Sequence, residues 1–158
     1  MTKILFVCLG NICRSPSAQA IFEDLLIPRN LTDDVQVDSA GTADYHVGEP
    51  PCAIMQRVAA ERGIEMGHLR ARQLTLADFD HFDHLYAMDR SNLRTMQRMA
   101  PPRHQHKLKL FLSAAPELGP DVPDPYYGGI QQARQVMDII EEGAEALLQE
   151  LLKSDICP

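Results

Sequence analysis

The amino-acid sequence predicts an α/β fold: a single doubly wound domain in which a four-stranded parallel sheet carries helices on both faces. Two observations predict this class. Short apolar segments alternate with longer amphipathic segments along the chain, an order that favours parallel strands joined by helices. The chain has 158 residues without repeats or an obvious linker, a length that suits one hydrophobic core. We therefore expect residues 1–158 to form one domain.

Four short apolar segments are the predicted strands: residues 3–8, 35–39, 85–88 and 107–112. The first segment is rich in Ile, Phe and Val, as buried parallel strands are, and it ends at Cys8. In a doubly wound sheet, ligands bind beyond the carboxyl ends of the strands, where the strand order reverses. Cys8 therefore stands where a ligand site is expected.

Amphipathic segments between and after the strands are the predicted helices. They cover residues 17–27, 51–62, 89–99 and 130–152. Ser15 is expected to cap the first helix, with Pro16 at its first position, a combination that is typical of helix starts. Asp89 or Ser91 is expected to cap the third helix.

Composition and charge limit the classes of function. Hydrophobic residues make up 45% and charged residues 23% of the chain, as in ordinary globular proteins. The formal net charge of −7 argues against binding to nucleic acid. The N-terminal apolar segment is about seven residues long, too short to span a membrane, so no membrane association is expected. The four cysteines do not resemble a disulfide framework, which favours a reducing, cytoplasmic setting.

One segment combines the residue types of an anion-binding loop. Residues 8–15 are Cys8, Leu9, Gly10, Asn11, Ile12, Cys13, Arg14 and Ser15. The segment runs from a strand end to a helix N-terminus, where main-chain N–H groups and the helix dipole bind anions. The same dipoles and Arg14 favour the thiolate form of Cys8, which is the nucleophilic form. The planar guanidinium of Arg14 can bind two phosphate oxygens at once.

The small and polar residues of this loop support the same interpretation. Gly10 and Asn11 tolerate the left-handed backbone that a tight loop requires. The Ser15 hydroxyl can donate a hydrogen bond to the thiolate as it leaves phosphorus. No Gly-Lys-Ser/Thr sequence follows, so neither a nucleotide cofactor nor a metal ion is expected. The ordinary alternative is a buried cysteine at a strand end, which the combination of residues makes the weaker interpretation.

Asp124 is the candidate proton donor. Transfer of a phosphoryl group to sulfur requires a proton for the leaving oxygen. Two prolines flank Asp124 and restrict its backbone, and the residue lies between the last strand and the last helix. Alone, this pattern would indicate only a turn. Tyr45 and Tyr126 are expected to wall a deep slot that lets phosphotyrosine reach the sulfur and leaves phosphoserine too short.

These motifs resemble the low-molecular-weight protein tyrosine phosphatases, and in particular their bacterial branch, over nearly the whole chain. The segments that carry the resemblance are residues 7–15, 38–42, 70–73, 88–89 and 124–126, together with His68. The resemblance implies metal-independent hydrolysis of phosphotyrosine and of small aryl phosphates through a phosphocysteine. It implies Cys8 as the nucleophile, Arg14 as the phosphate ligand and Asp124 as the general acid and base.

The resemblance also implies residues that support the loop. The Asn11 side chain is expected to hydrogen-bond with Ser15, Ser39 and His68. Asp89 is expected to orient Arg14. Taken alone, His68 would be read as a structural or surface histidine and Asp89 as a helix cap.

The implied partners follow from the same resemblance. They are a phosphotyrosine-containing protein substrate, for which a tyrosine kinase is one candidate, and inorganic phosphate or vanadate as ligands of the active site. Cys13 is implied to form a reversible disulfide with Cys8 under oxidation, which predicts a redox-sensitive enzyme.

Three competing interpretations are weaker. An arsenate reductase of the same fold needs two further cysteines as an electron relay, and none lies between Cys52 and Cys157. A non-catalytic phosphotyrosine-binding module would retain Arg14 but lose Cys8 or Asp124. A metal site is suggested by four histidines, but the two pairs flank helices and lack a nearby cysteine or a constellation of carboxylates: His81, His84, His104 and His106.

Overall fold

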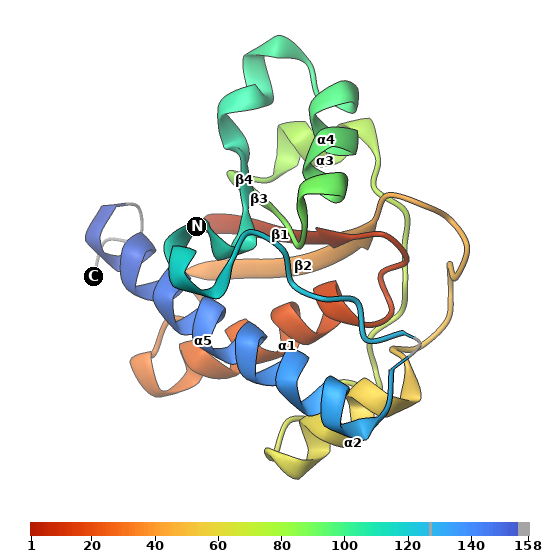
Figure 1. The fold of residues 1–158 in the computed structure, drawn as a ribbon. Helices are drawn as coiled ribbons and strands as arrows, with labels where there is room; N and C mark the ends of the chain where they lie inside the picture. Colours follow the sequence, from red (N-terminus) through yellow and green to blue (C-terminus); the bar gives the residue numbers. More distant parts are fainter. Residues whose placement is uncertain (127, 155–158) are drawn as a thin grey trace.

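The computed structural model describes residues 1–126 and 128–154 of the chain. Tyr127 and Cys157 therefore lie outside the described residues. The centre of the molecule is a parallel sheet of four strands in the order β2-β1-β3-β4 (Figure 1). Its strands are β1 (Thr2–Cys8), β2 (Val35–Gly41), β3 (His84–Ala87) and β4 (Leu108–Leu110). The predicted α/β class with a four-stranded parallel sheet is confirmed.

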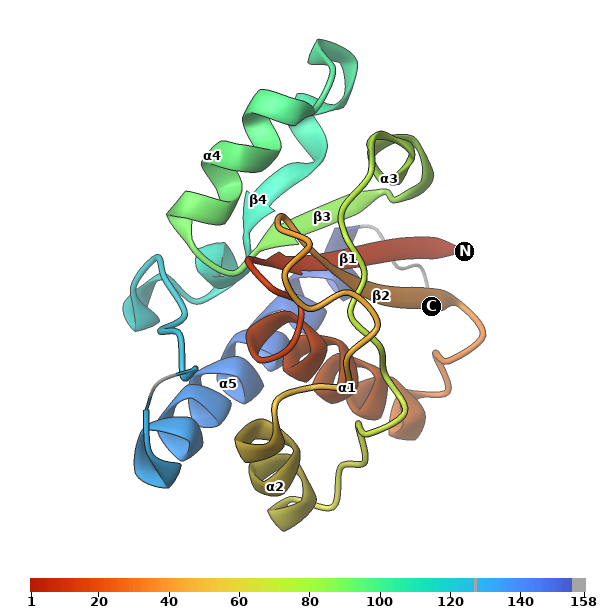
Figure 2. The same cartoon turned by 90° about the vertical axis from the view of Figure 1, so that its right-hand side faces the viewer.

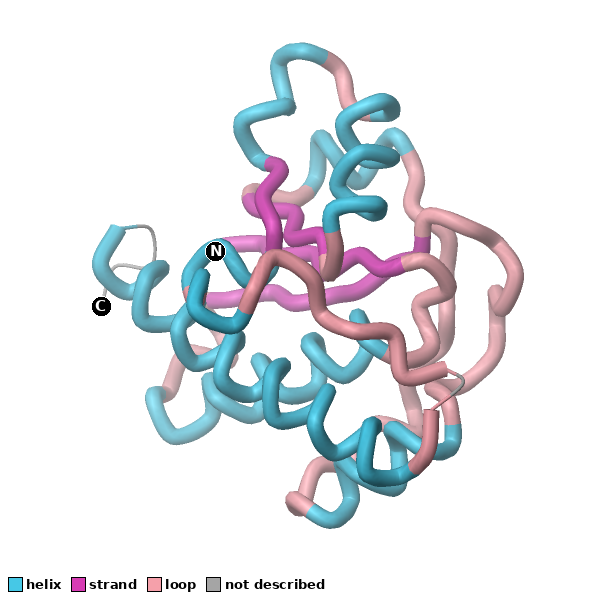
Figure 3. The backbone as a smooth tube through the Cα atoms, in the orientation of Figure 1, coloured by secondary structure: helices cyan, strands magenta, loops and turns pink. Residues whose placement is uncertain are grey.

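Helices cover both faces of the sheet, as Figures 1 and 3 show. One face carries α1 (Arg14–Leu26), α2 (Ala53–Glu61) and α5 (Ile130–Ser154). The other face carries α3 (Leu76–His81) and α4 (Arg90–Met99).

The alternation of side chains along β1 builds both cores. Ile4 and Phe6 are fully buried in the cluster that contains α1, α2 and α5, whereas Leu5 and Val7 are fully buried in the cluster that contains α3 and α4. Successive side chains of a strand point to opposite faces, so a strand covered on both faces must be apolar throughout. This explains why the first strand is an unbroken apolar run.

The fourth strand is shorter than predicted. The segment expected as a strand over residues 107–112 forms β4 only over Leu108–Leu110, between two 3₁₀ helices, η2 (Pro102–Lys107) and η3 (Phe111–Ala114). Phe111 is fully buried against α5, where a Cβ on Gly143 would lie 2.7 Å from the Phe111 ring. The chain leaves the sheet at this point because burying the aromatic ring stabilises the fold more than further strand pairing.

Two details of the helix starts differ from the prediction. Helix α1 begins at Arg14, so Ser15 lies inside the first turn instead of capping it. Pro16 is tolerated there because the N–H groups of the first turn have no partner within the helix. Helix α3 was not predicted; a capping box formed by Thr75 and Asp78 begins it. The remaining short helices are η1 (Ile27–Arg29) and η4 (Pro116–Leu118).

The strand order reverses at β1, which pairs with β2 on one side and with β3 on the other. The carboxyl end of β1, marked by Cys8, is therefore the switch point of the sheet, as predicted. Figure 2 shows the loop after β1, the start of α4 and the segment that leads to α5 converging at this edge. In the part of the chain that the structure describes, no helix has the length and apolarity to cross a membrane.

Candidate active site

The loop after β1 curls around the sulfur of Cys8. The Asn11 main-chain N–H donates to Cys8 Sγ over 3.3 Å, and Ser15 Oγ lies 3.0 Å from the same sulfur. Asn11 has a φ of 57°, the left-handed conformation predicted for it. Gly10 does not share that conformation, and the reason predicted for it was wrong. A Cβ at Gly10 would lie 3.0 Å from the ring of His46, a tight contact that the ring would have to shift to relieve.

Arg14 closes the loop and is only 4% exposed. One guanidinium nitrogen, Nη1, donates to Asp89 Oδ2 at 2.7 Å and to the Val122 carbonyl at 3.0 Å. The contact with Asp89 agrees with the expectation that this carboxylate orients Arg14. Burial by itself would lower the pKa of Arg14, but the charge of Cys8 and the bond to Asp89 raise it above its usual value. Arg14 is thus a fixed positive charge in an acidic protein.

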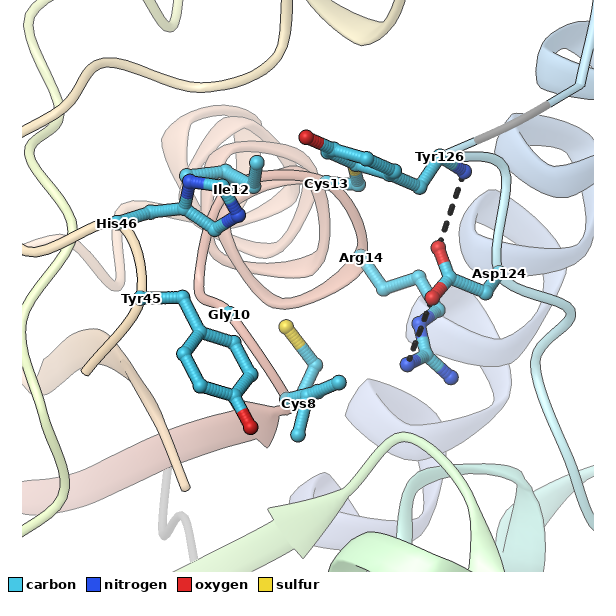
Figure 4. Close-up of a pocket in the computed structure, with 10 residues that line it drawn as sticks. Cys8, Gly10, Ile12, Cys13, Arg14, Tyr45, His46, Asp124 and Tyr126 are labelled. Carbon is cyan, nitrogen blue, oxygen red and sulfur yellow. Dashed lines mark hydrogen bonds and ion pairs between the residues drawn. The ribbon is translucent and has the colours of Figure 1, made fainter. Parts of the chain in front are cut away.

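Asp124 faces Arg14 from the segment that precedes α5. Its Oδ2 lies 3.7 Å from Nη2 of Arg14, and its Oδ1 accepts a hydrogen bond from the Tyr126 main-chain N–H at 3.0 Å. Figure 4 shows Asp124 and Arg14 on one side of the pocket, with Cys8 at its base. The side chain is half-exposed, so it can exchange protons with solvent.

These side chains line a cavity of about 340 Å³. Its walls include Tyr45 and Tyr126, as predicted, and also His46, which the sequence reasoning missed although it follows Tyr45 directly. The rings of His46 and Tyr126 have their centroids 5.8 Å apart, and His46 Nδ1 is 2.9 Å from Glu49 Oε2. The remaining lining residues are Leu9, Gly10, Ile12 and Cys13.

The Asn11 carboxamide holds the loop to the second strand. Its nitrogen donates to Ser15 Oγ at 2.8 Å and to Ser39 Oγ at 2.9 Å, which are two of the three expected contacts. Its oxygen accepts from the Arg72 main-chain N–H at 3.0 Å. Among the described residues, His68 is not a partner of Asn11. The Arg72 main-chain N–H, and not His68, is the donor that the structure brings to that oxygen.

His68 lies at a different surface pocket, together with Glu23 and Thr32. Burial raises the pKa of Glu23 in that pocket, and a charge on His68 would act to lower it. Gln19, which the resemblance did not single out, joins the network by accepting a hydrogen bond from Ser39 Oγ at 2.7 Å. The alternation of polar residues on α1 gave no signal for this contact, since Gln19 alone reads as a solvated helix position.

Cys13 faces Cys52 at the start of α2. A hydrogen bond from the Cys13 thiol lowers the pKa of Cys52, whereas the same contact and burial raise the pKa of Cys13. The main-chain N–H of Cys52 also donates to the Ile12 carbonyl at 2.7 Å, which ties α2 to the loop. The described cysteines, Cys8, Cys13 and Cys52, are free thiols in this structure.

Two of the histidines considered as metal ligands make other contacts. His104 Nε2 is 2.5 Å from Asp80 Oδ1, and His84 stacks on Tyr86 with ring centroids 6.1 Å apart. Within residues 1–126 and 128–154, no group of three histidine, cysteine or carboxylate side chains is arranged to hold a metal ion.

Comparison with known proteins assigns the chain. The family model of the low molecular weight phosphotyrosine protein phosphatases matches residues 3–156. The chain belongs to this family. The Bacillus subtilis low molecular weight protein-tyrosine-phosphatase YfkJ is 40% identical to it over 154 residues, which cover 97% of each chain. The protein described here is thus a protein-tyrosine phosphatase enzyme.

Solved structures agree with this assignment. A protein tyrosine phosphatase from Entamoeba histolytica with Hepes in its active site superposes with a TM-score of 0.93. It is 36% identical, over 97% of this chain and 98% of that one. DARP, the Drosophila arginine phosphatase, superposes with a TM-score of 0.89 at 36% identity, over 98% of this chain and 99% of its own. The fold is thus shared by one enzyme that is named a tyrosine phosphatase and another that is named an arginine phosphatase.

Proposed function

We propose that this phosphatase hydrolyses phosphotyrosine in proteins, and small aryl phosphates, through a phosphocysteine on Cys8. The observation that supports the proposal is one cavity that contains a thiol, a buried guanidinium and a half-exposed carboxyl group, from Cys8, Arg14 and Asp124. Nucleophile, oxyanion ligand and acid are the three groups that phosphoryl transfer without a metal ion requires.

In the first step, the Cys8 thiolate attacks phosphorus. The S–P bond forms while the bond from phosphorus to the aryl oxygen breaks, and Asp124 gives its proton to that oxygen. Arg14 and the main-chain N–H groups of residues 9–15 bind the equatorial oxygens, where negative charge is spread in the transition state. The bond from Asp89 holds Arg14 in position for this contact.

In the second step, water attacks phosphorus and the S–P bond breaks. Asp124, now a carboxylate, takes a proton from the water as it attacks. The sulfur leaves as a thiolate, which the Ser15 hydroxyl stabilises from 3.0 Å. Inorganic phosphate is the product, so phosphate and its analogue vanadate bind the same loop.

The walls of the cavity favour a flat, long substrate. Tyr45, His46 and Tyr126 surround the entrance, and an aryl ring can stack between such side chains. The substrate protein supplies the phosphotyrosine, and a tyrosine kinase phosphorylated on its own tyrosines is one candidate. The reaction needs Cys8 as a free thiol, so we place the enzyme in a reducing compartment, the cytoplasm.

Trapping of the intermediate tests this function. After acid quench during turnover of a ³²P-labelled aryl phosphate, we expect label on the peptide that contains Cys8. Cys8→Ser should lose hydrolysis while still binding vanadate, and Cys52→Ser serves as the matched control because it leaves the nucleophile in place. Label on another residue, or turnover of Cys8→Ser near the wild-type rate, would exclude Cys8 as the nucleophile.

A comparison of substrates tests the side chain that is dephosphorylated. Peptides of one sequence carrying phosphotyrosine, phosphoserine or phosphoarginine should differ in kcat/KM, with phosphotyrosine highest. A higher kcat/KM for phosphoarginine would indicate the activity for which the Drosophila relative is named. It would contradict the proposal that phosphotyrosine is the substrate.

A further inference from the structure

A buried chain of hydrogen bonds leads from the sulfur of Cys8 to Gln19 on α1. Ser15 Oγ is 3.0 Å from the sulfur, and Asn11 Nδ2 donates to Ser15 at 2.8 Å. The second hydrogen of Asn11 Nδ2 bonds Ser39 Oγ at 2.9 Å, and Ser39 donates to Gln19 Oε1 at 2.7 Å. Gln19 is 7% exposed and the other three polar residues are buried more deeply. Such a chain is costly unless every member is satisfied.

Contacts at both ends of this series of hydrogen bonds fix which group donates in each bond. The Arg72 main-chain N–H donates to Asn11 Oδ1, so the amide hydrogens of Asn11 must point to the two serines. At the other end, Gln19 Nε2 lies 3.5 Å from the Val37 carbonyl, and its amide also bonds the Glu23 side chain. This leaves Gln19 Oε1 as the acceptor that faces Ser39.

The fixed donor directions extend as far as Cys8, the proposed nucleophile. Because the Ser39 proton points to Gln19, it points away from Asn11, and Ser39 Oγ presents its lone pairs to the Asn11 amide. Ser15 Oγ accepts the other Asn11 hydrogen, so its own proton is available to Cys8. The competing acceptor for that proton, the Ala40 carbonyl, is farther away, at 3.5 Å. A thiolate can only accept, so Ser15 must be the donor when Cys8 is ionised.

We propose that Gln19 is a positioning residue: by accepting the Ser39 proton, its side-chain oxygen keeps the Ser15 hydroxyl turned as a donor toward the sulfur of Cys8. Gln19 touches neither substrate nor the reacting atoms and acts only through Ser39, Asn11 and Ser15. Its effect on turnover rests on the proposed function, in which the thiolate is the leaving group of the second step. Its effect on the reactivity of Cys8 does not.

Removal of the Gln19 oxygen tests the proposal. Gln19→Met keeps the length and approximate volume of the side chain but offers Ser39 no carbonyl acceptor. The paired exchange Gln19→Glu with Glu23→Gln restores an acceptor toward Ser39 and an amide donor beside it. Gln56→Met is the matched control, since Gln56 donates to the Pro51 carbonyl at 2.7 Å, away from the chain of bonds.

Two readouts separate positioning from a general loss of structure. The first is the pH midpoint of Cys8 alkylation by iodoacetamide, followed by mass spectrometry of the Cys8 peptide. The second is the separate change of kcat and KM on an aryl phosphate. For Gln19→Met we expect the midpoint to rise by about half a pH unit and kcat to fall about 3- to 10-fold, with KM changed less than about twofold.

The paired exchange should return the alkylation midpoint to that of the wild type and kcat to within about twofold of it. Gln56→Met should leave both the midpoint and kcat unchanged. An unshifted midpoint in folded Gln19→Met, or a paired exchange that behaves like Gln19→Met, overturns the proposal. If Gln19→Met does not fold, Ser39→Ala removes the same link and must raise the midpoint. If no variant, including the wild type, hydrolyses phosphotyrosine, the proposed function fails while alkylation still decides the role of Gln19.

Discussion

At the scale of single residues, the site depends on groups that act in pairs. Arg14 is oriented by Asp89 and lies beside Asp124, the proposed proton donor. The sequence motifs named Cys8, Arg14 and Asp124, because nucleophile, cation and acid are chemically distinctive residue types. The positions that support them, Gln19 and the main-chain N–H of Arg72, have no distinctive residue type and became evident only from contacts.

Asp124 is expected to matter most for substrates with poor leaving groups. Asp124→Ala should lower kcat about 10²- to 10⁴-fold for phosphotyrosine but much less for an aryl phosphate whose phenol is strongly acidic, because such a phenolate leaves without a proton. The measurement is kcat across a series of aryl phosphates of graded leaving-group pKa. Equal slowing across the series would remove Asp124 from the role of acid. Asp121→Ala is the control, since Asp121 pairs with Arg90 outside the cavity.

The thiol pair of Cys13 and Cys52 gives a prediction about pH. The hydrogen bond from Cys13 lowers the pKa of Cys52, so the Cys52 thiolate should exist at lower pH than in an ordinary cysteine. Cys13→Ala removes the donor and should shift the alkylation of Cys52 to higher pH, whereas Cys13→Ser retains a donor and should shift it less. The measurement is the rate of alkylation of the Cys52 peptide against pH. A shift to lower pH in Cys13→Ala would show that Cys13 is not the donor.

At the scale of elements, the end of β2 determines the shape of the loop after β1. Gly41 pairs with Cys8 in the sheet, and a Cβ on Gly41 would lie 2.7 Å from the Leu9 carbonyl oxygen and 3.1 Å from the Asn11 nitrogen. Real Cβ atoms do not approach main-chain atoms so closely, so the loop would have to move. The glycine thus allows strand and loop to approach within contact distance.

Gly41→Ala should therefore affect catalysis more than folding. We expect kcat/KM to fall by at least about 10-fold, because displacement of the anion-binding N–H groups weakens transition-state contacts. The free energy of unfolding should fall by about 1–3 kcal/mol, as for other overpacked positions. Urea denaturation and steady-state kinetics measure the two effects. Gly129→Ala, where a Cβ meets no atom within 4 Å, is the control and should change neither.

Other elements show where sequence patterns reach their limit. The span of β1 and the cap of α4 at Asp89 follow from local chemistry, an apolar run in one case and a side chain that accepts from the Asn92 N–H in the other. The end of β4 does not, because it depends on the burial of Phe111 against Gly143, more than thirty residues away in sequence. A local sequence pattern predicts an element whose stability comes from neighbouring residues. It does not predict where an element ends when a contact with a distant segment decides that end.

At the scale of the whole molecule, an acidic protein has its candidate anion site at one place. The formal net charge is −7, yet the loop brings the α1 N-terminus and the buried Arg14 to one point. A buried positive charge therefore lies at the cavity of a protein that is acidic as a whole. This arrangement favours phosphate over extended polyanions such as nucleic acids.

Inorganic phosphate should stabilise the folded enzyme through this site. At a concentration about 100 times its Kd, a ligand specific for the folded state adds about 2.7 kcal/mol, which raises the Tm by several degrees. Arg14→Lys should reduce the phosphate-dependent rise, because an ammonium cannot form the two parallel bonds of a guanidinium. Arg134→Lys, at an exposed pair with Glu61, should retain the full rise. Thermal unfolding with and without phosphate measures both, and an equal rise in Arg14→Lys would place the phosphate elsewhere.

The sequence by itself determined the fold class and the position of Cys8 at a strand end, and it named the candidates for nucleophile, phosphate ligand and acid. These follow from local patterns and from residue types that few other functions require. Only the tertiary structure decided that His46 lines the cavity, that Arg72 and Gln19 occupy the network, and that His68 lies outside it. The physical reason is that a hydrogen-bond partner is selected by distance and direction, which the packing of distant segments sets and no local pattern encodes.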